Sequence, residues 1–262
     1  MTEQPLPHAL DRTVLIRARR DTVFQYFTDS RRWADWWGAG SRIEPEVGGS
    51  VLVRYPNGVE AGGEVLAIEP PARIVFSYGY ASGQPIPLGA SRVTVELDEI
   101  ADGTLLRLRH ELADAGVRDQ HVQGWRYQLS LFANAVADEV HADAAGRADA
   151  WFDAWSEPDA TTREAALAEC VAPEIRFRDR FSAIAGIDEL LPHLAAVHVF
   201  MPGMQIERDG PIHHCQGTAL CAWIAKGTDG AERGRGTNVF TFDAEGRIID
   251  VVGLWVETAA RG

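Results

Sequence analysis

The sequence has little lysine and little positive charge. Among its 262 residues there is one lysine, Lys226, and the formal net charge is -13. Nucleic acids and anionic membrane surfaces bind proteins through clustered positive charge. We therefore expect no nucleic-acid partner and no membrane partner, which leaves small molecules and other proteins.

Cysteine is also scarce, and its spacing excludes two common frameworks. Cys170, Cys215 and Cys221 are odd in number and show no CxxC pair, so neither a disulfide framework nor a zinc site is indicated. The glycine-rich stretch GAERGRGTN lacks the Gly-Lys-Ser/Thr and the following helix of a phosphate loop. We expect hairpin glycines there, and we expect neither a metal nor a cofactor.

Long hydrophobic runs are absent from the sequence as well. No run approaches the roughly 18 apolar residues of a membrane-spanning helix, and the first residues, MTEQPLPHALDRT, lack the basic and apolar regions of a secretory signal. Hydrophobic residues make up 46% and charged residues 24% of the chain, values typical of globular proteins. These features predict a cytoplasmic location.

Two different patterns of secondary structure follow one another along the chain. Up to residue 140 the pattern predicts a strand, two short helices, a run of strands and one long helix with apolar residues at steps of three and four. After His141 the composition changes to ADAAGRADA, a new apolar helix starts near Trp151, and helices now precede the strands. The sequence predicts an α+β protein with domains at 1–141 and 142–262.

The motifs TVFQYFTDSRRWADWW, EPEVGGSVLVRY, GGEVLAIEPPARIVFSY, GTLLRLRHEL and the GW of Gly124 and Trp125 follow one another in the first half. In order and spacing this half resembles the activator of heat-shock protein 90 ATPase homologues, within the START-like (SRPBCC) superfamily. The resemblance implies a helix-grip fold, with an antiparallel sheet and a long C-terminal helix around a cavity. It does not imply co-chaperone work, because the client-facing domain of the eukaryotic activators has no counterpart here.

The second half carries EIRFRDRFSAIAGIDEL, the PG of Pro202 and Gly203, HHCQGTALCAW and GTNVFTFDAEGRIIDVVGLW. This half resembles the SnoaL-like, polyketide cyclase-like branch of the nuclear transport factor 2-like superfamily. The resemblance implies a cone-shaped α+β barrel with a curved antiparallel sheet around a second pocket. Both folds carry many functions, so the fold alone does not name a reaction.

Aromatic residues are the candidates for a ligand pocket in the first domain. Apolar pockets are lined by such rings, with a few polar tips that orient the ligand. Plain core packing is the alternative for each ring, and a hydrogen-bonded structural role is the alternative for the one histidine in the set. The candidates are Trp36, Tyr55, Tyr78, His110, Trp125 and Phe132.

Asp179 is the candidate catalytic residue of the second domain. It ends the strand EIRFRD, where the resemblance to ketosteroid isomerases implies an acid/base aspartate facing the pocket. A carboxylate there would serve as a general base. The alternative is a strand-end aspartate that binds turn amides.

Several further polar and aromatic residues could complete this second site. Adjacent residues on a strand point to opposite faces, so His213 and His214 cannot jointly hold a metal, and His214 is the one we expect at the pocket. Asn238 offers the amide that an oxyanion needs. The ligand-binding candidates of this domain are Phe177, His198, Trp223 and Trp255.

Three hypotheses of function follow from the sequence. The first is binding of small hydrophobic or aromatic metabolites in both domains, without metal or cofactor. The second is a cofactor-free isomerase, cyclase or hydratase that uses Asp179 as its base. The third is an interaction module that forms a homodimer through the second domain, because the segments TALCAWIAK and GLWV present apolar side chains outward.

Overall fold

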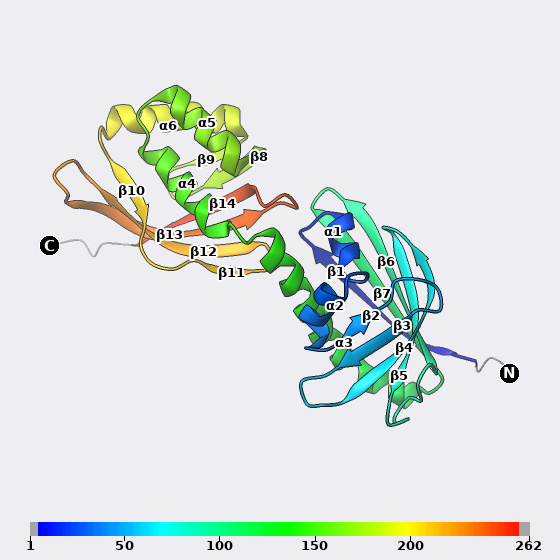
Figure 1. Ribbon diagram of the computed structural model, residues 1–262. Coiled ribbons are helices and arrows are strands. Elements are labelled where there is room, and N and C mark those ends of the chain that lie inside the picture. Colours follow the sequence, from blue (N-terminus) through cyan, green and yellow to red (C-terminus); the bar gives the residue numbers. More distant parts are fainter. Residues whose placement is uncertain (1–4, 257–262) are drawn as a thin grey trace. The chain divides into compact units, whose positions relative to one another are not determined.

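The computed structural model describes residues 5–256, and the chain divides into two compact units between Glu139 and Val140 (Figure 1). Each unit combines helices with one seven-stranded sheet. The predicted α+β class is therefore confirmed, and each unit is described below by itself.

The sheet of the first unit is an antiparallel meander, as the sequence predicts. Its strand order is β1-β7-β6-β5-β4-β3-β2, so β2 to β7 pair in chain order and β1 pairs with β7 at the edge. The turns fall at PNG, PPAR and ADG, where glycine and proline favour chain reversal. The strands are β1 (His8–Ile16), β2 (Arg42–Ile43), β3 (Ser50–Arg54), β4 (Glu60–Glu69), β5 (Arg73–Tyr80), β6 (Ser91–Ile100) and β7 (Gly103–Leu112).

Three helices complete this unit: α1 (Arg20–Gln25), α2 (Ser30–Trp37) and α3 (Ala115–Val140). Asp29 caps α2 by accepting a hydrogen bond from the backbone N–H of Arg32. The long helix buries one stripe, because its apolar residues recur at steps of three and four. That stripe contains Trp125, Leu129, Phe132 and Val136.

Hydrogen bonds and an ion pair join the C-terminal end of helix α3 to the rest of its unit. Both Oε atoms of Glu139 accept hydrogen bonds from the Arg32 guanidinium, at 2.6 and 2.9 Å. The hydroxyl of Tyr26 donates to Oε2 of the same carboxylate at 2.9 Å. A bidentate arginine contact is stronger and more directional than a single ion pair, so it holds the last turn of α3 against α1 and α2.

The junction between the units is shorter than the sequence suggests. Three residues separate the end of helix α3 at Val140 from the start of helix α4 (Ala144–Ser156), so most of ADAAGRADA is the first half of α4 rather than a lead-in to it. Alanine has the highest helix propensity of all residues, and the single Gly146 does not prevent the helix from forming there.

The second unit begins with α4, α5 (Ala160–Cys170) and β8 (Val171–Arg178). Its sheet order is β10-β12-β13-β14-β8-β9, with β11 paired to β12. The sheet is antiparallel, as expected, except that β8 pairs with β14 in parallel. No hairpin joins these two strands, and their direction is free of that constraint. The remaining elements are β9 (Ala183–Ala185), α6 (Ile187–Phe200), β10 (Gln205–Arg208), β11 (His213–Cys215), β12 (Thr218–Lys226), β13 (Glu232–Phe242) and β14 (Ile248–Trp255).

The core of the second unit lies on one face of this sheet. Along β12, Ala219, Cys221, Trp223 and Ala225 are buried while the residues between them are exposed or half-buried. This alternation is typical of a sheet with one covered face. Helix α4 contributes buried side chains, Trp151 among them, to the same core.

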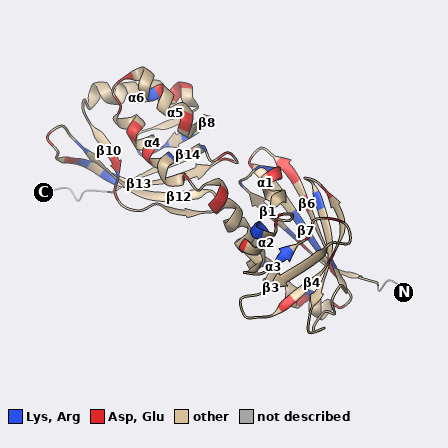
Figure 2. Ribbon diagram, in the orientation of Figure 1, with Lys and Arg blue, Asp and Glu red and all other residues tan. Residues whose placement is uncertain are grey.

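Charged residues of both signs are interspersed over both units (Figure 2). On the first sheet, Arg92 pairs with Glu111 across β6 and β7, and Arg109 pairs with Asp11 across β7 and β1. Within the described residues, none of the helices has the length and apolar character that crossing a bilayer requires.

Candidate functional site

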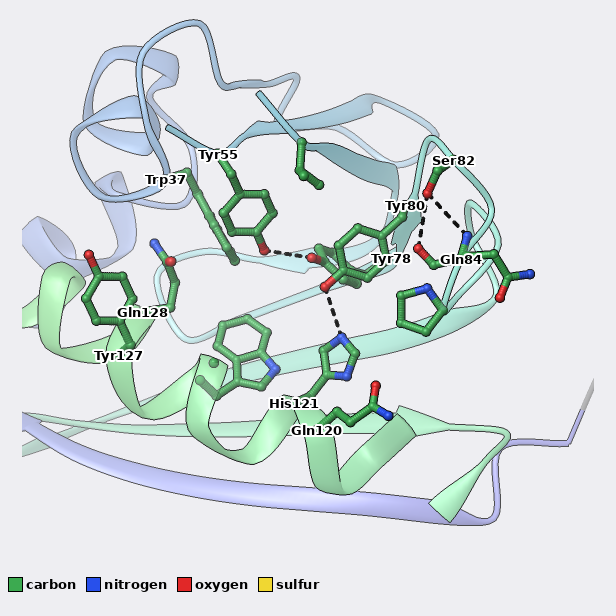
Figure 3. Close-up of a pocket in the computed structure, with 14 residues that line it drawn as sticks. Trp37, Tyr55, Tyr78, Tyr80, Ser82, Gln84, Gln120, His121, Tyr127 and Gln128 are labelled. Carbon is green, nitrogen blue, oxygen red and sulfur yellow. Dashed lines mark hydrogen bonds between the residues drawn. The ribbon is translucent and has the colours of Figure 1, made fainter. Parts of the chain in front are cut away.

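A cavity of about 520 Å³ lies in the first unit (Figure 3). This volume falls within the range of pockets for small organic molecules. Its wall is aromatic and polar, and none of the lining side chains is an acid, a lysine or an arginine. The lining residues are Trp37, Tyr55, Val59, Tyr78, Tyr80, Ser82, Gln84, Pro85, Gln120, His121, Gly124, Trp125, Tyr127 and Gln128.

Helix α3 presents one of its faces to this cavity. His121, Gly124, Trp125 and Gln128 stand at positions i, i+3, i+4 and i+7, which lie on one side of a helix. A Cβ built on Gly124 meets no atom within 4 Å. The cavity therefore extends up to the backbone of α3 at this residue.

Three tyrosines, two on β5 and one directly after β3, place their hydroxyls close together in the cavity (Figure 3). The hydroxyls of Tyr55 and Tyr78 lie 2.7 Å apart and share a hydrogen bond. Burial raises the pKa of Tyr55 to about 12. Burial, followed by the neighbouring hydroxyls of Tyr55 and Tyr80, also raises the pKa of Tyr78. Both hydroxyls therefore stay neutral donors at physiological pH.

His121 stands next to this group, and its tautomer follows from its contacts. Its Nδ1 lies 2.7 Å from the carbonyl oxygen of Val117, which can only accept, so Nδ1 carries a hydrogen. In the neutral imidazole Nε2 is then an acceptor. The Tyr80 hydroxyl, 3.2 Å away, donates to it (Figure 3).

His110 lies behind the cavity wall rather than in it. It is fully buried on β7, and burial lowers its pKa to about 3, with a further contribution from His121. Its Nδ1 accepts from the indole N–H of Trp125 at 2.9 Å, so Nε2 carries the hydrogen and donates to Ser91 Oγ. His110 therefore holds the Trp125 ring in place from within the core.

The predicted ligand-binding residues of this domain divide into two groups. Tyr55, Tyr78 and Trp125 line the cavity, whereas Trp36, Phe132 and His110 are core residues behind it. The Trp36 indole donates to the carbonyl of Tyr26 at 3.3 Å, and its ring lies 5.0 Å from that of Phe132. These contacts correspond to the core-packing alternative.

The sequence patterns do not single out His121 and Gln128, although both line the cavity. The signal was their spacing from Trp125, at four residues before and three after. Gln128 donates from Nε2 to the carbonyl of Trp36, a residue on α2, and so ties the wall of the cavity to that helix.

A second pocket lies in the second unit, and it is small. Its volume is about 40 Å³, far below the range of pockets that hold small organic molecules. Large rings fill the space around it, which is why so little remains open. Its lining residues are Trp151, Phe152, Trp155, Phe177, Asp179, Ile206, Trp223, Asn238, Gly253 and Trp255.

Asp179 faces this pocket and also satisfies a turn. Its Oδ2 accepts from the indole N–H of Trp255 at 3.0 Å, and its Oδ1 accepts from the backbone N–H of Phe181 at 2.8 Å. The neighbouring Arg178 points elsewhere, to the carboxylate of Asp250 at 2.8 Å. Asp179 thus has both of the features that the sequence left as alternatives: its carboxylate lines the pocket, and it accepts a hydrogen bond from a turn amide.

Asn238 is the second polar side chain of this pocket. It lies on β13, is 5% exposed and lines the pocket. A Cβ on Gly253 would stand 3.1 Å from Cβ of Asp179 and 3.4 Å from Oδ1 of Asn238. The absence of a side chain at Gly253 keeps the space between these two groups open.

Two predicted residues do not join this group. His214 contacts His141, with their ring nitrogens 3.2 Å apart, and the backbone N–H of Gly217. His198 lies near the C-terminal end of α6, where burial and the charge of Arg163 lower its pKa. Neither lines the pocket, whereas Phe177, Trp223 and Trp255 do. A histidine that the patterns miss, His193, lies nearer, with its ring 5.7 Å from Trp155.

Comparison with known families accounts for both halves. Residues 17–137 match the family described as activator of Hsp90 ATPase homolog 1-like protein, and residues 148–251 match the SnoaL-like domain. The chain joins an Hsp90-activator-homologue-like domain to a SnoaL-like domain. The first of these, hereafter the AHSA1-like domain, contains the large cavity, and the SnoaL-like domain contains the small pocket.

Solved structures resemble one domain at a time. A SnoaL-like family protein from Agrobacterium tumefaciens is 24% identical over 45% of this chain and 99% of its own, with a TM-score of 0.42. An AHSA1 protein from Silicibacter pomeroyi is 22% identical over 50% of this chain and 99% of its own, also at 0.42. The CalU16 protein from Micromonospora echinospora is 27% identical over 48% of this chain and 70% of its own, at 0.39. No curated protein matches the chain.

The two domains belong to families that, taken together, are known for ligand binding and for polyketide cyclase- or isomerase-like activity. A fold shared by many functions identifies a type of site rather than a reaction. The choice between these activities therefore depends on the side chains of the AHSA1-like cavity and of the SnoaL-like pocket.

Proposed function

We propose that the AHSA1-like domain binds a small, uncharged aromatic molecule in its cavity. The observation that carries this proposal is the composition of the wall, in which aromatic rings surround about 520 Å³ and no lining side chain carries a fixed charge. Burying an ion without a partner of opposite charge is costly. A flat, neutral ring gains from contact with Trp37 and Trp125 without that cost.

Intrinsic tryptophan fluorescence tests this proposal directly, because Trp37 and Trp125 line the cavity. The full chain is titrated with a library of neutral aromatic compounds, and a matched series of aromatic carboxylates is run beside it. We expect saturable changes with neutral compounds and weaker or no changes with the carboxylates. Silence across the neutral series would overturn the proposal.

A cavity-filling variant separates binding from an unspecific signal. Gly124→Leu places a side chain in open space on the cavity face of α3 and should abolish the saturable change. Gly124→Ala adds one methyl group and should retain most of the binding. If both variants bind like the original chain, the ligand lies outside this cavity.

A second candidate function belongs to the SnoaL-like domain. It is proton transfer on a compact carbon acid, with Asp179 as the base and Asn238 as the donor to the developing oxyanion. The observation that favours it is that the carboxylate and a buried amide line the same pocket on either side of Gly253. Its volume of about 40 Å³ requires the surrounding rings to move before a substrate enters.

Hydrogen exchange tests this second candidate. Small ketones and enones are incubated with the full chain in heavy water, and deuterium incorporation next to the carbonyl is measured. Asp179→Asn should abolish any exchange that the original chain catalyses, and the exposed Asp153→Asn is the matched control. Exchange that survives in Asp179→Asn would exclude Asp179 as the base.

A homodimer through the SnoaL-like sheet is the third candidate. On the open face of this sheet Leu220 pairs with Val239, and Val239 pairs with Val252, so three strands present one apolar row. Leu220 is 42% and Leu254 53% exposed. Light scattering tests the proposal: a mass of two chains that falls to one chain in Leu220→Lys supports it, and a monomeric original chain overturns it.

A further inference from the structure

The polar end of the AHSA1-like cavity has a definite pattern of hydrogen-bond donors and acceptors. It consists of the hydroxyls of Tyr55, Tyr78 and Tyr80 and the imidazole of His121 (Figure 3). Each hydroxyl has one hydrogen to donate and lone pairs to accept with. Counting which of these the protein itself uses shows what a ligand has to supply.

The hydrogen of the Tyr80 hydroxyl is already used in a hydrogen bond within the protein. Nδ1 of His121 donates to the carbonyl of Val117, so Nε2 accepts and the hydrogen between Nε2 and Tyr80 belongs to Tyr80. What Tyr80 can still offer to a ligand is the lone pair of its oxygen. At this position the cavity therefore presents an acceptor.

The Tyr55 and Tyr78 pair offers a hydrogen-bond donor to a ligand. The two hydroxyls carry two hydrogens, and the hydrogen bond between them, 2.7 Å long, uses one. With Tyr78 as the donor within the pair, which is the direction in which the contact raises the pKa of Tyr78 and lowers that of Tyr55, the hydrogen of Tyr55 remains available at the cavity end. Because burial raises the pKa of both hydroxyls, this hydrogen is not lost by ionisation at neutral pH.

One donor beside one acceptor is the complement of a hydroxyl group, which itself donates once and accepts. We infer that this end of the cavity binds the hydroxyl of a neutral phenol: the phenol O–H donates to Tyr80 Oη, and the phenol oxygen accepts from the Tyr55 and Tyr78 pair. This inference rests on the proposed aromatic-binding function and names the ligand class of the same cavity.

The phenol is bound in its neutral form. No arginine or lysine side chain lines the cavity, so a phenolate there would be a buried anion without a partner of opposite charge, which raises the pKa of a bound acid. A ketone of the same shape would use the donor but leave the Tyr80 oxygen without a partner. A methyl ether would keep an acceptor and lose the hydrogen.

The experiment uses 4-nitrophenol and its methyl ether, 4-nitroanisole, as probes of nearly the same shape. Both are titrated into the full chain and followed by quenching of tryptophan fluorescence. We expect the phenol to bind about three- to tenfold more tightly than the ether, which corresponds to one neutral hydrogen bond. Tyr80→Phe removes the acceptor and should bring the two affinities together.

His121→Gln tests the positioning role of the imidazole, with His213→Gln, on the exposed strand β11, as the matched control. Without Nε2 the Tyr80 hydroxyl is free to turn its hydrogen toward the ligand, so the ratio of the phenol affinity to the ether affinity should fall. The control should keep the full preference. Equal preference in all variants would overturn the inference.

The colour of the probe reports its protonation state. Its phenolate absorbs visible light and its phenol does not, so binding of the neutral form should bleach the solution at a pH near the probe's own pKa. An increase in phenolate absorbance on binding would overturn the neutral-phenol assignment. If neither probe binds, the proposed function itself fails, whereas equal binding of both probes leaves that function intact and removes only the phenol assignment.

Discussion

The indole N–H of Trp125 donates a hydrogen bond of 2.9 Å to Nδ1 of His110, which is fully buried. This contact joins the long helix α3 to strand β7 behind the cavity. It also defines the protonation state of His110, because a nitrogen that accepts a hydrogen bond carries no hydrogen. The AHSA1-like domain therefore folds around a neutral histidine.

Stability should depend on pH through His110. Burial lowers its pKa in the folded chain from 6.5 to about 3, so between these values the unfolded chain binds a proton that the folded chain does not. Neutral His110 therefore causes no loss of stability above pH 6.5, the pKa of the unfolded chain. Below that pH the free energy of unfolding falls by about 1.4 kcal/mol per pH unit until the pKa of the folded chain is reached. Denaturant unfolding over this range measures the slope.

The pH dependence of the free energy of unfolding should be weaker in His110→Phe, because phenylalanine cannot titrate. It should be unchanged in the control His213→Gln. His110→Phe should also lose about 1–3 kcal/mol at neutral pH, because the Trp125 indole and the Ser91 hydroxyl lose a buried partner. An unchanged slope in His110→Phe would contradict the assignment of this titration.

The contact of Glu139 with Arg32 and Tyr26 should contribute measurably to stability. Glu139→Ala removes a two-pronged charged contact and the acceptor of the Tyr26 hydroxyl, and we expect a loss of about 1–3 kcal/mol in chemical denaturation. The control is Glu69→Ala, which breaks a surface pair with Arg73 and should change stability by under about 1 kcal/mol. Similar losses in both variants would show that the Glu139 contact has no special weight.

Asp179→Asn should lower the stability of the SnoaL-like domain in addition to its effect on any reaction. Both carboxylate oxygens accept hydrogen bonds, from Trp255 and from Phe181, and an amide can replace only one of them. We expect a loss of about 1–3 kcal/mol. Trp255→Phe removes the indole N–H that would face the new side-chain amide at position 179. The double variant should therefore lose less stability than the sum of the two single losses. Thermal melts of the four chains measure this, and strict additivity would argue against the contact.

Two glycines of the AHSA1-like domain should respond in opposite ways to alanine. Gly124 lies within α3 with open space around it, and Gly124→Ala should stabilise the chain by up to about 1 kcal/mol through helix propensity. On β5, a Cβ on Gly79 would overlap the backbone oxygen of Pro87, so Gly79→Ala should lower the melting temperature. A stable Gly79→Ala would mean that the loop around Pro87 readily moves away.

Local patterns in the sequence predict the class and order of the elements because each helix and strand carries its own periodicity. The same patterns place Tyr55 and Tyr78 at the cavity, since both stand on or beside a strand of the first sheet. They cannot separate Trp36 from its neighbour Trp37, of which only Trp37 lines the cavity. That difference depends on how α2 is rotated against α3, which is a tertiary property.

The SnoaL-like site shows the same limit. Asp179 and Asn238 are found from their strands, but their closeness depends on the register between β13 and β14 and on Gly253. The parallel pairing of β8 with β14 joins segments more than 70 residues apart along the chain, and no local pattern specifies it. The size of the pocket likewise depends on how large rings from several elements pack together.

The difference in size between the two pockets affects the rates at which they can bind ligands. A ligand can enter the cavity of about 520 Å³ as it stands, so its observed association rate should rise in proportion to concentration. Entry into the space of about 40 Å³ must wait for rings to rearrange, so at high concentration its rate should level off at the rate of that rearrangement. The first domain would respond to a ligand at the pace of diffusion, and the second at a pace set by its own tryptophans.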